Sequence, residues 1–203
     1  MTRLGKTAYT EFPSLIHDLA GDFRVEDVWT LRTPGAGPHD FPVLLAAIRK
    51  AGGFTDQSPL VRLLFAIRWR IGAVLGWDSP STGVGRRVVS LRDRLPADLR
   101  GAPRGPDRSG MPLTPVYELG TECARELANK TVHTVLHLRW ARRMNGEYGV
   151  TISVLVKPNG LFGRLYMAAI APFRHLIVYP ALTRRWERAW RERGSTTRNG
   201  EPA

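Results

Sequence analysis

Apolar and polar residues alternate most clearly between residues 115 and 158. The runs in this region are rich in valine, leucine, isoleucine and threonine, and their period of two is typical of β-strands with one buried face. The pair Asn145-Gly146 separates the last two runs and favours the tight turn of a β-hairpin. The pattern therefore predicts two or three antiparallel strands, of which the last two form a hairpin.

The length of the hairpin loop decides which side chains share a face of this sheet. A two-residue turn would set Arg139 opposite Ile152 and so place charge in an apolar row. A three-residue loop, 144–146, with Gly146 in the left-handed region, separates an apolar row from a polar one. The apolar row pairs Trp140 with Val150, Leu138 with Ile152 and Leu136 with Val154, and the polar row pairs Arg139 with Thr151, His137 with Ser153 and His133 with Lys157. We therefore predict the three-residue loop and a sheet that is wet on its polar face.

His133 and His137 belong to the polar row and are expected in solvent. A strand rises about 3.3 Å per residue, so four residues hold the two rings about 13 Å apart, too far to share a metal ion. No metal site is predicted.

Two helices are predicted before the sheet. Asp40 can cap a helix over residues 41–51, and Ser58-Pro59 begins a second helix that runs to about residue 76. The second helix carries an apolar stripe that we expect to pack in the core: Leu60, Leu63, Leu64, Ile67, Ile71, Val74 and Leu75. The opposite face, with Arg62, Phe65 and Trp69, is the alternative place for a partner or an interface.

A strand is predicted at residues 23–32, where Phe23, Val25, Trp29 and Leu31 share one face. Asp27 interrupts this apolar face. Either a bulge or local turn moves its side chain aside, or the carboxylate is buried for a functional reason.

The most apolar segment, residues 163–190, contains Arg174, His175 and two prolines. A membrane-spanning helix needs roughly 20 apolar residues, and the Arg174-His175 pair divides this segment into shorter runs. We therefore expect a bent helix that covers the apolar face of the sheet, because each proline removes a helical hydrogen bond. On a helical wheel the expected inner side carries Leu165, Tyr166, Ala169, Phe173, Leu176 and Ile177, and the expected outer side carries Arg164, Ala168, Ala171, Arg174 and His175.

Length and composition predict a single domain. The 203 residues can bury a sizeable core, and the lone Cys123 excludes an intrachain disulfide. No signal-peptide pattern opens the sequence, so we expect a cytoplasmic protein. We expect an N-terminal extension at residues 1–22, one domain at 23–192 with a flexible loop at 96–115, and a disordered tail at 193–203.

The net charge of +12 is uneven, with +5 in residues 51–110 and +5 in residues 159–203. Basic segments attract phosphates and anionic membranes, although the ratio of 26 arginines to 4 lysines also suggests a codon bias. No nucleic-acid recognition motif accompanies the charge, so no nucleic-acid partner is expected. The segment STGVGRR lacks both the dinucleotide fingerprint and the phosphate loop, so no cofactor is predicted.

The stretch VRLLFAIRWRIGAVLGWD, the strands after it and NGLFGRLYMAAIAPFRHLIV together resemble an uncharacterised bacterial domain-of-unknown-function family of the SRPBCC superfamily. That superfamily includes START lipid-transfer domains and aromatic polyketide cyclases. The resemblance implies an α+β helix-grip fold, in which a curved antiparallel sheet wraps around a long C-terminal helix and encloses an apolar cavity. Two further helices near the N-terminus complete the expected fold. Because members of the resembled family occur fused to dehydrogenase-like domains, the resemblance also implies a separate nucleotide-dependent oxidoreductase as a partner.

The first functional hypothesis is binding of a small apolar or aromatic molecule, such as a lipid or polyketide-like metabolite, in the cavity between sheet and C-terminal helix. The expected contacts come from the apolar face of the sheet and from the helix: Trp29, Tyr117, Leu136, Leu138, Trp140, Ile152, Val154, Tyr166 and Phe173.

The alternative is an enzyme of cyclase or dehydratase type, in which a pocket tyrosine or carboxylate moves a proton. The candidates are Asp27, Tyr117, Glu118 and Tyr166, and the sequence assigns no pairing among them. The coincidence of Cys123 and His133 in neighbouring strands is attributed to chance rather than to a nucleophile and its base. A third hypothesis places the arginine-rich segments RWR and TRRWERAWRER on an anionic membrane surface.

Overall fold

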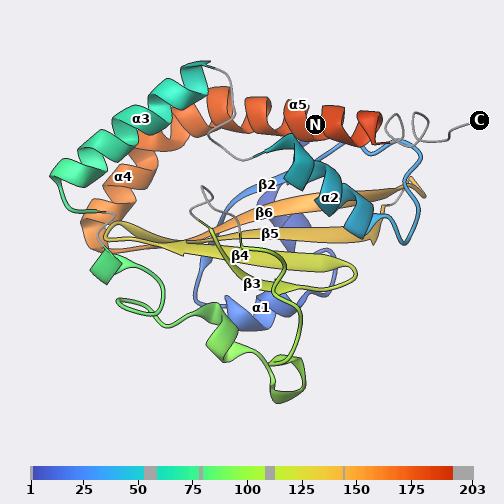
Figure 1. Ribbon diagram of the computed structural model, residues 1–203, viewed down its shortest axis with the longest axis horizontal. Helices are drawn as coiled ribbons and strands as arrows, with labels where there is room; N and C mark the ends of the chain where they lie inside the picture. The colour runs from blue at the N-terminus through green and yellow to red at the C-terminus, as the bar shows by residue number, and fades with distance from the viewer. Residues whose placement is uncertain (1, 53–58, 78–79, 108–112, 144, 194–203) are drawn as a thin grey trace, which may run out of the picture.

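A computed structural model describes residues 2–52, 59–77, 80–107, 113–143 and 145–193 of the chain. Six antiparallel strands form one sheet in the order β1, β2, β6, β5, β4, β3, with helices on both of its faces (Figure 1). The strands are β1 (Thr2–Arg3), β2 (Arg24–Thr30), β3 (Thr114–Glu118), β4 (Glu122–Ala128), β5 (Val132–Arg142) and β6 (Tyr148–Pro158). This α+β architecture, with a long C-terminal helix, confirms the predicted fold class.

The predicted hairpin register is confirmed along its whole length. Trp140 pairs with Val150, Leu138 with Ile152 and Leu136 with Val154, and the polar row pairs as expected. Gly146 has a φ of +82°, the left-handed conformation that the three-residue loop requires. Met144 of that loop lies outside the described residues. The apolar row faces the C-terminal helix, and we call this side of the sheet the inner face.

The opposite side, the outer face, is not wet as predicted. It is covered by α1 (Leu15–Leu19) and by the segment that contains η4 (Leu91–Arg94) and η5 (Ala97–Leu99). These elements bury a second apolar core that includes Ile16, Leu91, Tyr117 and Leu155. His133 and His137 are therefore buried rather than in solvent. The alternation of β5 and β6 could not reveal this cover, because the covering residues come from distant parts of the chain.

Residues on both sides of the predicted domain boundaries contribute to this packing. Thr2 and Arg3 pair with β2, and Lys6–Tyr9 form the short helix η1 before α1, so residues 2–22 extend the sheet and its outer cover. The described part of the expected loop, 96–107, is irregular apart from η5 and is tied to β3 by the bond from the Glu118 amide to the Pro103 carbonyl. The expected tail, apart from Arg193, lies outside the described residues.

The inner face is covered by α2 (Phe41–Ala51) and by one long bent helix. This helix consists of α4 (Gly160–Phe173), the π-helical turn η6 (Arg174–Val178) and α5 (Tyr179–Glu192). The helix changes direction at η6 (Figure 1), next to the two prolines, as predicted. Trp186 and Trp190 of α5 are buried against α2 and the sheet, where they form the first core with Trp140 and Phe41.

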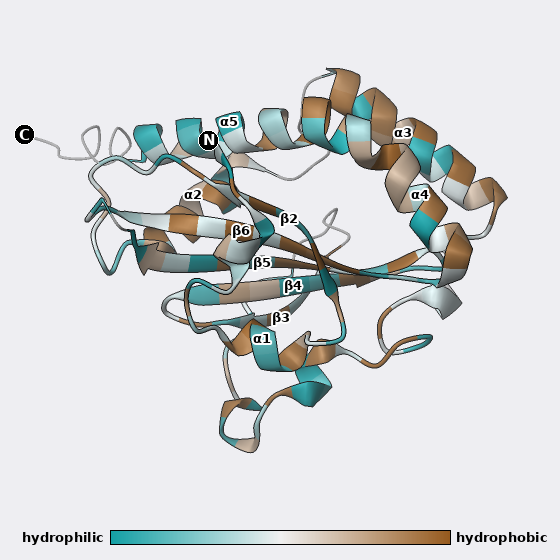
Figure 2. Ribbon diagram, turned by 180° about the vertical axis from the view of Figure 1, so that it is seen from behind, coloured by the Kyte–Doolittle hydropathy of each residue, from teal (hydrophilic) through white to brown (hydrophobic). Residues whose placement is uncertain are grey.

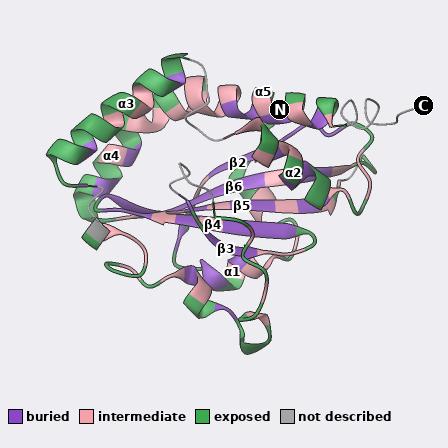
Figure 3. Cartoon of the chain, in the orientation of Figure 1, coloured by how far each residue is buried: buried purple, intermediate pink, exposed green. Residues whose placement is uncertain are grey.

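The helix α3 (Pro59–Val74) lies beside α4, away from the centre of the sheet, and is mostly exposed (Figure 3). The buried residues of α3 are Val61 and Gly72, so the predicted core stripe was wrong. A short helix, η3 (Pro80–Thr82), follows α3. Most of that stripe is in solvent: Leu60, Leu63, Ile67, Ile71, Val74 and Leu75. A helical wheel locates an apolar stripe but does not establish that another element covers it.

The wheel of the C-terminal helix was also assigned to the wrong sides at several positions. Leu165, Phe173 and Leu176 were expected inside and are exposed. Arg174 and His175 were expected outside, but their side chains are only 12% and 24% exposed. These two side chains turn inward because they face carboxylates on β2. The π-helical turn also changes the angular spacing of residues that the helical wheel assumed.

Candidate functional site

A β-bulge in β2 turns Asp27 toward the C-terminal helix. Val25 pairs with Leu155 and Asp27 pairs with the next residue, Val154, so Glu26 is the extra residue. The bulge divides the expected apolar face of this strand: Phe23 and Val25 pack in the outer core, whereas Trp29 and Leu31 pack in the inner one. The strand is bulged, as the first alternative predicts, and the carboxylate is nevertheless buried; a functional reason for that burial stays a prediction.

The carboxylate of Asp27 is surrounded by donors from β1 and from the C-terminal helix. Arg3 Nη2 lies 3.2 Å from Oδ1, and the Tyr179 hydroxyl donates to Oδ2 over 3.1 Å. Arg174 Nη1 lies 3.4 Å from Oδ2, and His175 Nδ1 lies 3.5 Å from Oδ1. Chain segments about 150 residues apart in sequence therefore meet at one acid.

The π-helical turn places these donors together. The amide of Tyr179 donates to the carbonyl of Arg174, five residues earlier, so the two residues lie one wide turn apart and both face β2. Arg174 also donates to Glu26 over 2.9 Å. The two carboxylates of the bulge are thus held by Arg3 and Arg174, and Glu26 also pairs with the half-exposed Arg24, 3.3 Å away.

Burial and charge set the protonation of this cluster. Burial, reinforced by the charge of Asp27, raises the pKa of Tyr179, which therefore stays a neutral hydrogen-bond donor. Burial lowers the pKa of His175, and the attraction of Asp27 opposes this only in part. Burial opposes the charge of Arg174, but Tyr179, Glu26 and Asp27 outweigh it and raise its pKa.

Three buried nitrogen atoms of this cluster have no hydrogen-bond partner within the described part of the chain. They are Trp29 Nε1, Arg174 Nε and His175 Nδ1. The Trp29 ring lies 6.4 Å from that of His175 and 5.4 Å from that of Tyr179, centroid to centroid. Buried donors are normally satisfied, so this group is suited to hydrogen-bond an oxygen atom that the chain itself does not supply.

An apolar floor adjoins these donors. Asp27, Val154, Leu136 and Arg125 occupy one cross-strand row on the inner face, from β2 to β4. Neighbouring strands are about 4.8 Å apart, so Val154 and Leu136 lie directly beyond the acid. Leu136 is only partly buried, as are the residues of the helix that pack against the same cluster: Tyr166, Ile170 and Tyr179. The inner face is closed under α5 and less completely covered under α4.

The structure brings some of the predicted ligand contacts together and separates others. Leu136, Val154 and Tyr166 lie around this floor. Leu138, Trp140, Ile152 and Trp29 belong to the dense first core with α2 and α5. Two predicted inward positions were wrong: Tyr117 packs in the outer core, and Phe173 is 48% exposed. A second β-bulge, between Pro115 and Tyr117 in β3, turns Tyr117 to the outer face, and no described element covers Phe173. Sequence period alone reveals neither.

The predicted proton-transfer candidates do not meet. Glu118 forms an ion pair with Arg49, and Tyr166 packs edge-on against Trp77 with 5.4 Å between ring centroids. Only Asp27 lies in the cluster described above. The sequence analysis did not identify Tyr179, the partner of Asp27. Tyr179 lies five residues after Arg174, and only the π-helical turn places the two side chains on the same side of the helix.

A second polar group that the sequence analysis missed lies on the outer face. Glu122 accepts hydrogen bonds from Tyr117 and from His137, each over 3.0 Å. Burial opposes the charge of Glu122, but the bonds from His137, the Leu15 amide and Tyr117 outweigh it and lower its pKa. Burial lowers the pKa of His137, so the pair is a neutral histidine donating to a carboxylate.

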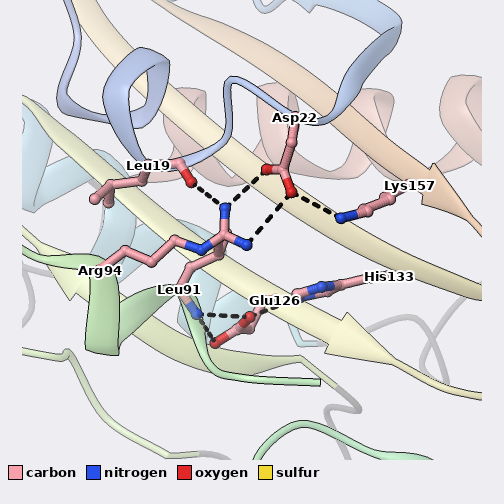
Figure 4. Close-up of polar contacts among 7 residues, drawn as sticks. All are labelled: Leu19, Asp22, Leu91, Arg94, Glu126, His133 and Lys157. Carbon is pink, nitrogen blue, oxygen red and sulfur yellow. Dashed lines mark hydrogen bonds and ion pairs between the residues drawn. The ribbon is translucent and has the colours of Figure 1, made fainter. Parts of the chain in front are cut away.

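A related arrangement follows along β4. Glu126 accepts from His133 over 2.7 Å and from the Leu91 amide, while Asp22 binds Arg94 and Lys157 nearby (Figure 4). The bonds from Arg94 and Lys157 lower the pKa of Asp22 despite partial desolvation. Apart from His137 Nδ1, which has no hydrogen-bond partner among the described residues, these groups have their partners within the protein. They attach the outer cover to the sheet, so we assign them a structural role.

An open groove of ≈ 1250 Å³ runs between α2 and α5, on the side of α5 that faces away from the sheet. Alanine, valine and leucine line its floor, and Arg184 and Arg188 lie along it. The groove is separate from the Asp27 cluster, since Leu176 and Pro180 line the groove whereas His175 and Tyr179 turn toward β2.

A family model described as "Protein of unknown function (DUF2867)" matches residues 19–181, which include the strands β2 to β6, α4, the π-helical turn and the start of α5. No curated protein and no solved structure matches the chain.

Proposed function

This chain belongs to the DUF2867 family, and we propose that it binds a small apolar or aromatic molecule between the inner face of the sheet and the C-terminal helix. The row from Asp27 across Val154 to Leu136 carries the proposal, because it joins a polar end to an apolar floor. Binding sites for small molecules combine these two features.

The polar end of this row limits the charge and the hydrogen-bonding groups that a ligand can have. Asp27 is already paired with Arg3 and Arg174, and Glu26 with Arg174 and Arg24, so neither carboxylate is left to bind a cationic ligand. The unpaired donors on Trp29 and Arg174 favour a neutral acceptor, such as a ketone or quinone oxygen. The ligand that we propose is therefore an aromatic or aliphatic ketone with an extended apolar body.

The fold also supports a proposal about the superfamily to which the chain belongs. A bent C-terminal helix over an antiparallel sheet is the arrangement implied by the resemblance to the SRPBCC superfamily, and we propose membership in it. The apolar-ligand proposal is consistent with the lipid-transfer and cyclase domains of that superfamily.

A matched ligand pair tests the proposal. Thermal-shift and native mass spectrometry measurements compare 2-acetylnaphthalene with 2-ethylnaphthalene, which differ in the carbonyl oxygen. We expect the ketone to bind about tenfold more tightly, the effect of one hydrogen bond to a charged donor. Leu136→Trp should fill the floor and abolish binding, whereas Leu161→Trp, on the exposed side of α4, should not.

Circular dichroism would establish that both variants keep the wild-type fold. The proposal is wrong if folded Leu136→Trp protein binds the ketone as wild type does, or if wild type binds neither compound.

A second candidate function is favoured by the hydrogen bond between Tyr179 and Asp27. The carboxylate of Asp27 can act as a base and remove a proton next to a carbonyl, while Tyr179 donates its one proton to Asp27 and orients it. The unpaired Trp29 Nε1 and Arg174 Nε can donate to the resulting oxygen anion. This is the chemistry of the cyclase or dehydratase alternative, with Asp27 as the base and Tyr179 as its hydrogen-bond partner.

Proton NMR in D2O tests this candidate directly. Exchange of the methyl protons of 2-acetylnaphthalene should be faster with wild type than in buffer. It should fall to the buffer rate with Asp27→Asn and be unchanged with Asp18→Asn, a substitution on the exposed surface of α1. Exchange at the buffer rate with wild type would exclude this activity on this ketone.

A further inference from the structure

Exposed apolar side chains are concentrated on one part of the molecule. Twelve of the fourteen large hydrophobic residues exposed among the described positions lie on α3, on α4 or within three residues of their ends. We call these two helices, with the three residues that follow each of them, the arm. Figure 2 shows both as largely hydrophobic ribbons at one side of the fold. Single exposed apolar residues are ordinary, but a concentration of this kind marks an interaction surface.

The packing of the two helices explains the exposure. α4 buries Gly163 and Met167, and the opposite side of this helix carries Leu161, Leu165 and Phe173 in solvent. Among the most exposed side chains of the arm are Val74, at 86%, and Leu176, at 77%. Trp77 packs against Phe162 and Tyr166, so the connection after α3 holds the arm together from within.

The charge around the arm has one sign. Residues 59–77 and 159–186 contain no aspartate or glutamate. Their exposed cations include Arg62, Arg70 and Arg164. The groove between α2 and α5 continues this surface, because Leu60 and Leu176 of the arm line it together with Arg184 and Arg188. An apolar face bordered by arginine complements an anionic lipid surface.

From this distribution we infer that the arm docks on the surface of an anionic lipid bilayer. A second copy of the chain is disfavoured as the occupant, because it would bring the same acid-free, arginine-bordered face against this one. The docking surface is the apolar side of α3 and α4, and not the arginine-rich end of α5, whose Trp186 and Trp190 are buried in the core.

The geometry favours surface contact over a membrane span. Gly160–Glu192 is the one helix within the described ranges that is long and apolar enough to cross a bilayer, by length and composition, and 11% of its most apolar window is buried. Spanning would remove Leu182, Trp186 and Trp190 from the first core. Contact through the outer side of α4 leaves that core intact.

Vesicle sedimentation of the full chain tests the inference. One set of vesicles contains phosphatidylcholine alone and the other contains about 30% phosphatidylglycerol. We expect binding to the anionic vesicles at about 0.05 M NaCl and a loss of at least about tenfold at about 0.5 M, because salt screens the arginines. Absence of binding to the anionic vesicles at low salt, or equal binding to both kinds of vesicle, would overturn the inference.

Substitutions locate the surface. Leu165→Ser with Phe173→Ser should reduce binding about tenfold or more, since two apolar side chains no longer enter the interface. Val89→Ser, also exposed but outside the arm, is the matched control and should bind as wild type does. Arg62→Gln with Arg70→Gln should reduce the difference in vesicle binding between low and high salt. Arg86→Gln, outside the arm, is the control and should leave that difference unchanged.

An equal loss with Val89→Ser would contradict the assignment to the arm. Sedimentation velocity without lipid tests a second copy of the chain as the occupant. If wild type forms a dimer that Leu165→Ser dissociates, the arm is a dimer interface and the inference of bilayer docking is wrong. These measurements do not depend on ketone binding, so either proposal can fail without the other.

Discussion

The Tyr179 hydroxyl donates a hydrogen bond of 3.1 Å to Asp27, and this contact joins a β-bulge to a π-helical turn. Each irregularity brings a polar side chain into an apolar layer, and each supplies the partner that the other needs. Irregular backbone at the meeting point of two elements is frequent at functional sites.

Tyr179→Phe tests how much this contact contributes to stability. Because the buried Asp27 oxygen would lose a donor, we expect the free energy of unfolding to fall by about 1–3 kcal/mol in urea titrations. Tyr148→Phe removes a hydroxyl from a half-buried tyrosine at the start of β6 and should change the free energy by less than about 0.5 kcal/mol. Equal losses in the two variants would show that the Asp27 contact contributes nothing specific.

Acid should destabilise the protein through His137. Burial depresses the pKa of this histidine in the folded chain, with Glu122 opposing the shift only in part. The unfolded chain therefore binds the proton more readily, and stability is complete above the ordinary histidine pKa of about 6.5 and lost as the pH falls below it. The depressed pKa of Glu122 acts in the same direction, but in the lower range where carboxylates titrate.

Urea titrations at about pH 7.5 and about pH 5.5 measure this effect. We expect wild type to be less stable at the lower pH and His137→Gln, which keeps a donor for Glu122, to show a smaller difference between the two pH values. His39→Gln, on the exposed surface, should retain the wild-type difference. A stability of wild type that does not change between these pH values would contradict the prediction.

Cys123 should be chemically silent in the folded protein. The thiol is buried on the inner face, and burial raises its pKa to about 12. We expect no reaction with 5,5′-dithiobis(2-nitrobenzoate) at about pH 8 until denaturant is added, because the thiolate is the reactive form. One thiol per chain should then react. Rapid reaction of the native protein would mean that the first core opens readily.

Gly163 sets the distance between α4 and the sheet. A Cβ atom at this position would lie 2.2 Å from the Thr131 carbonyl oxygen, which is backbone and cannot rotate away. Gly163→Ala should therefore displace the start of α4 and lower the free energy of unfolding by about 1–3 kcal/mol. Gly101→Ala has open space around the new Cβ and is the control. A neutral Gly163→Ala would indicate that α4 is not held at this contact.

The sequence by itself determined the elements whose rules are local. The register of β5 and β6 follows from the alternation of Leu136, Leu138 and Trp140 and from Gly146 in the turn, because a shift by one residue exchanges the two faces. The helix over residues 41–51 and the bend near Pro172 were equally accessible, since apolar spacing and prolines act within a few residues. Asp40 precedes this helix as predicted, but its carboxylate accepts from the Gly37 amide and does not cap the helix.

Only the tertiary structure decided what covers each face. His137 is buried because α1 and the η4 segment, more than 40 residues away in sequence, close over it. The α3 stripe is exposed because no described element packs on it, and Arg174 turns inward because the bulge presents Asp27 and Glu26 to it. Periodicity records that a surface is apolar or polar, whereas burial depends on which distant surface meets it, and that relation is not encoded in any single segment.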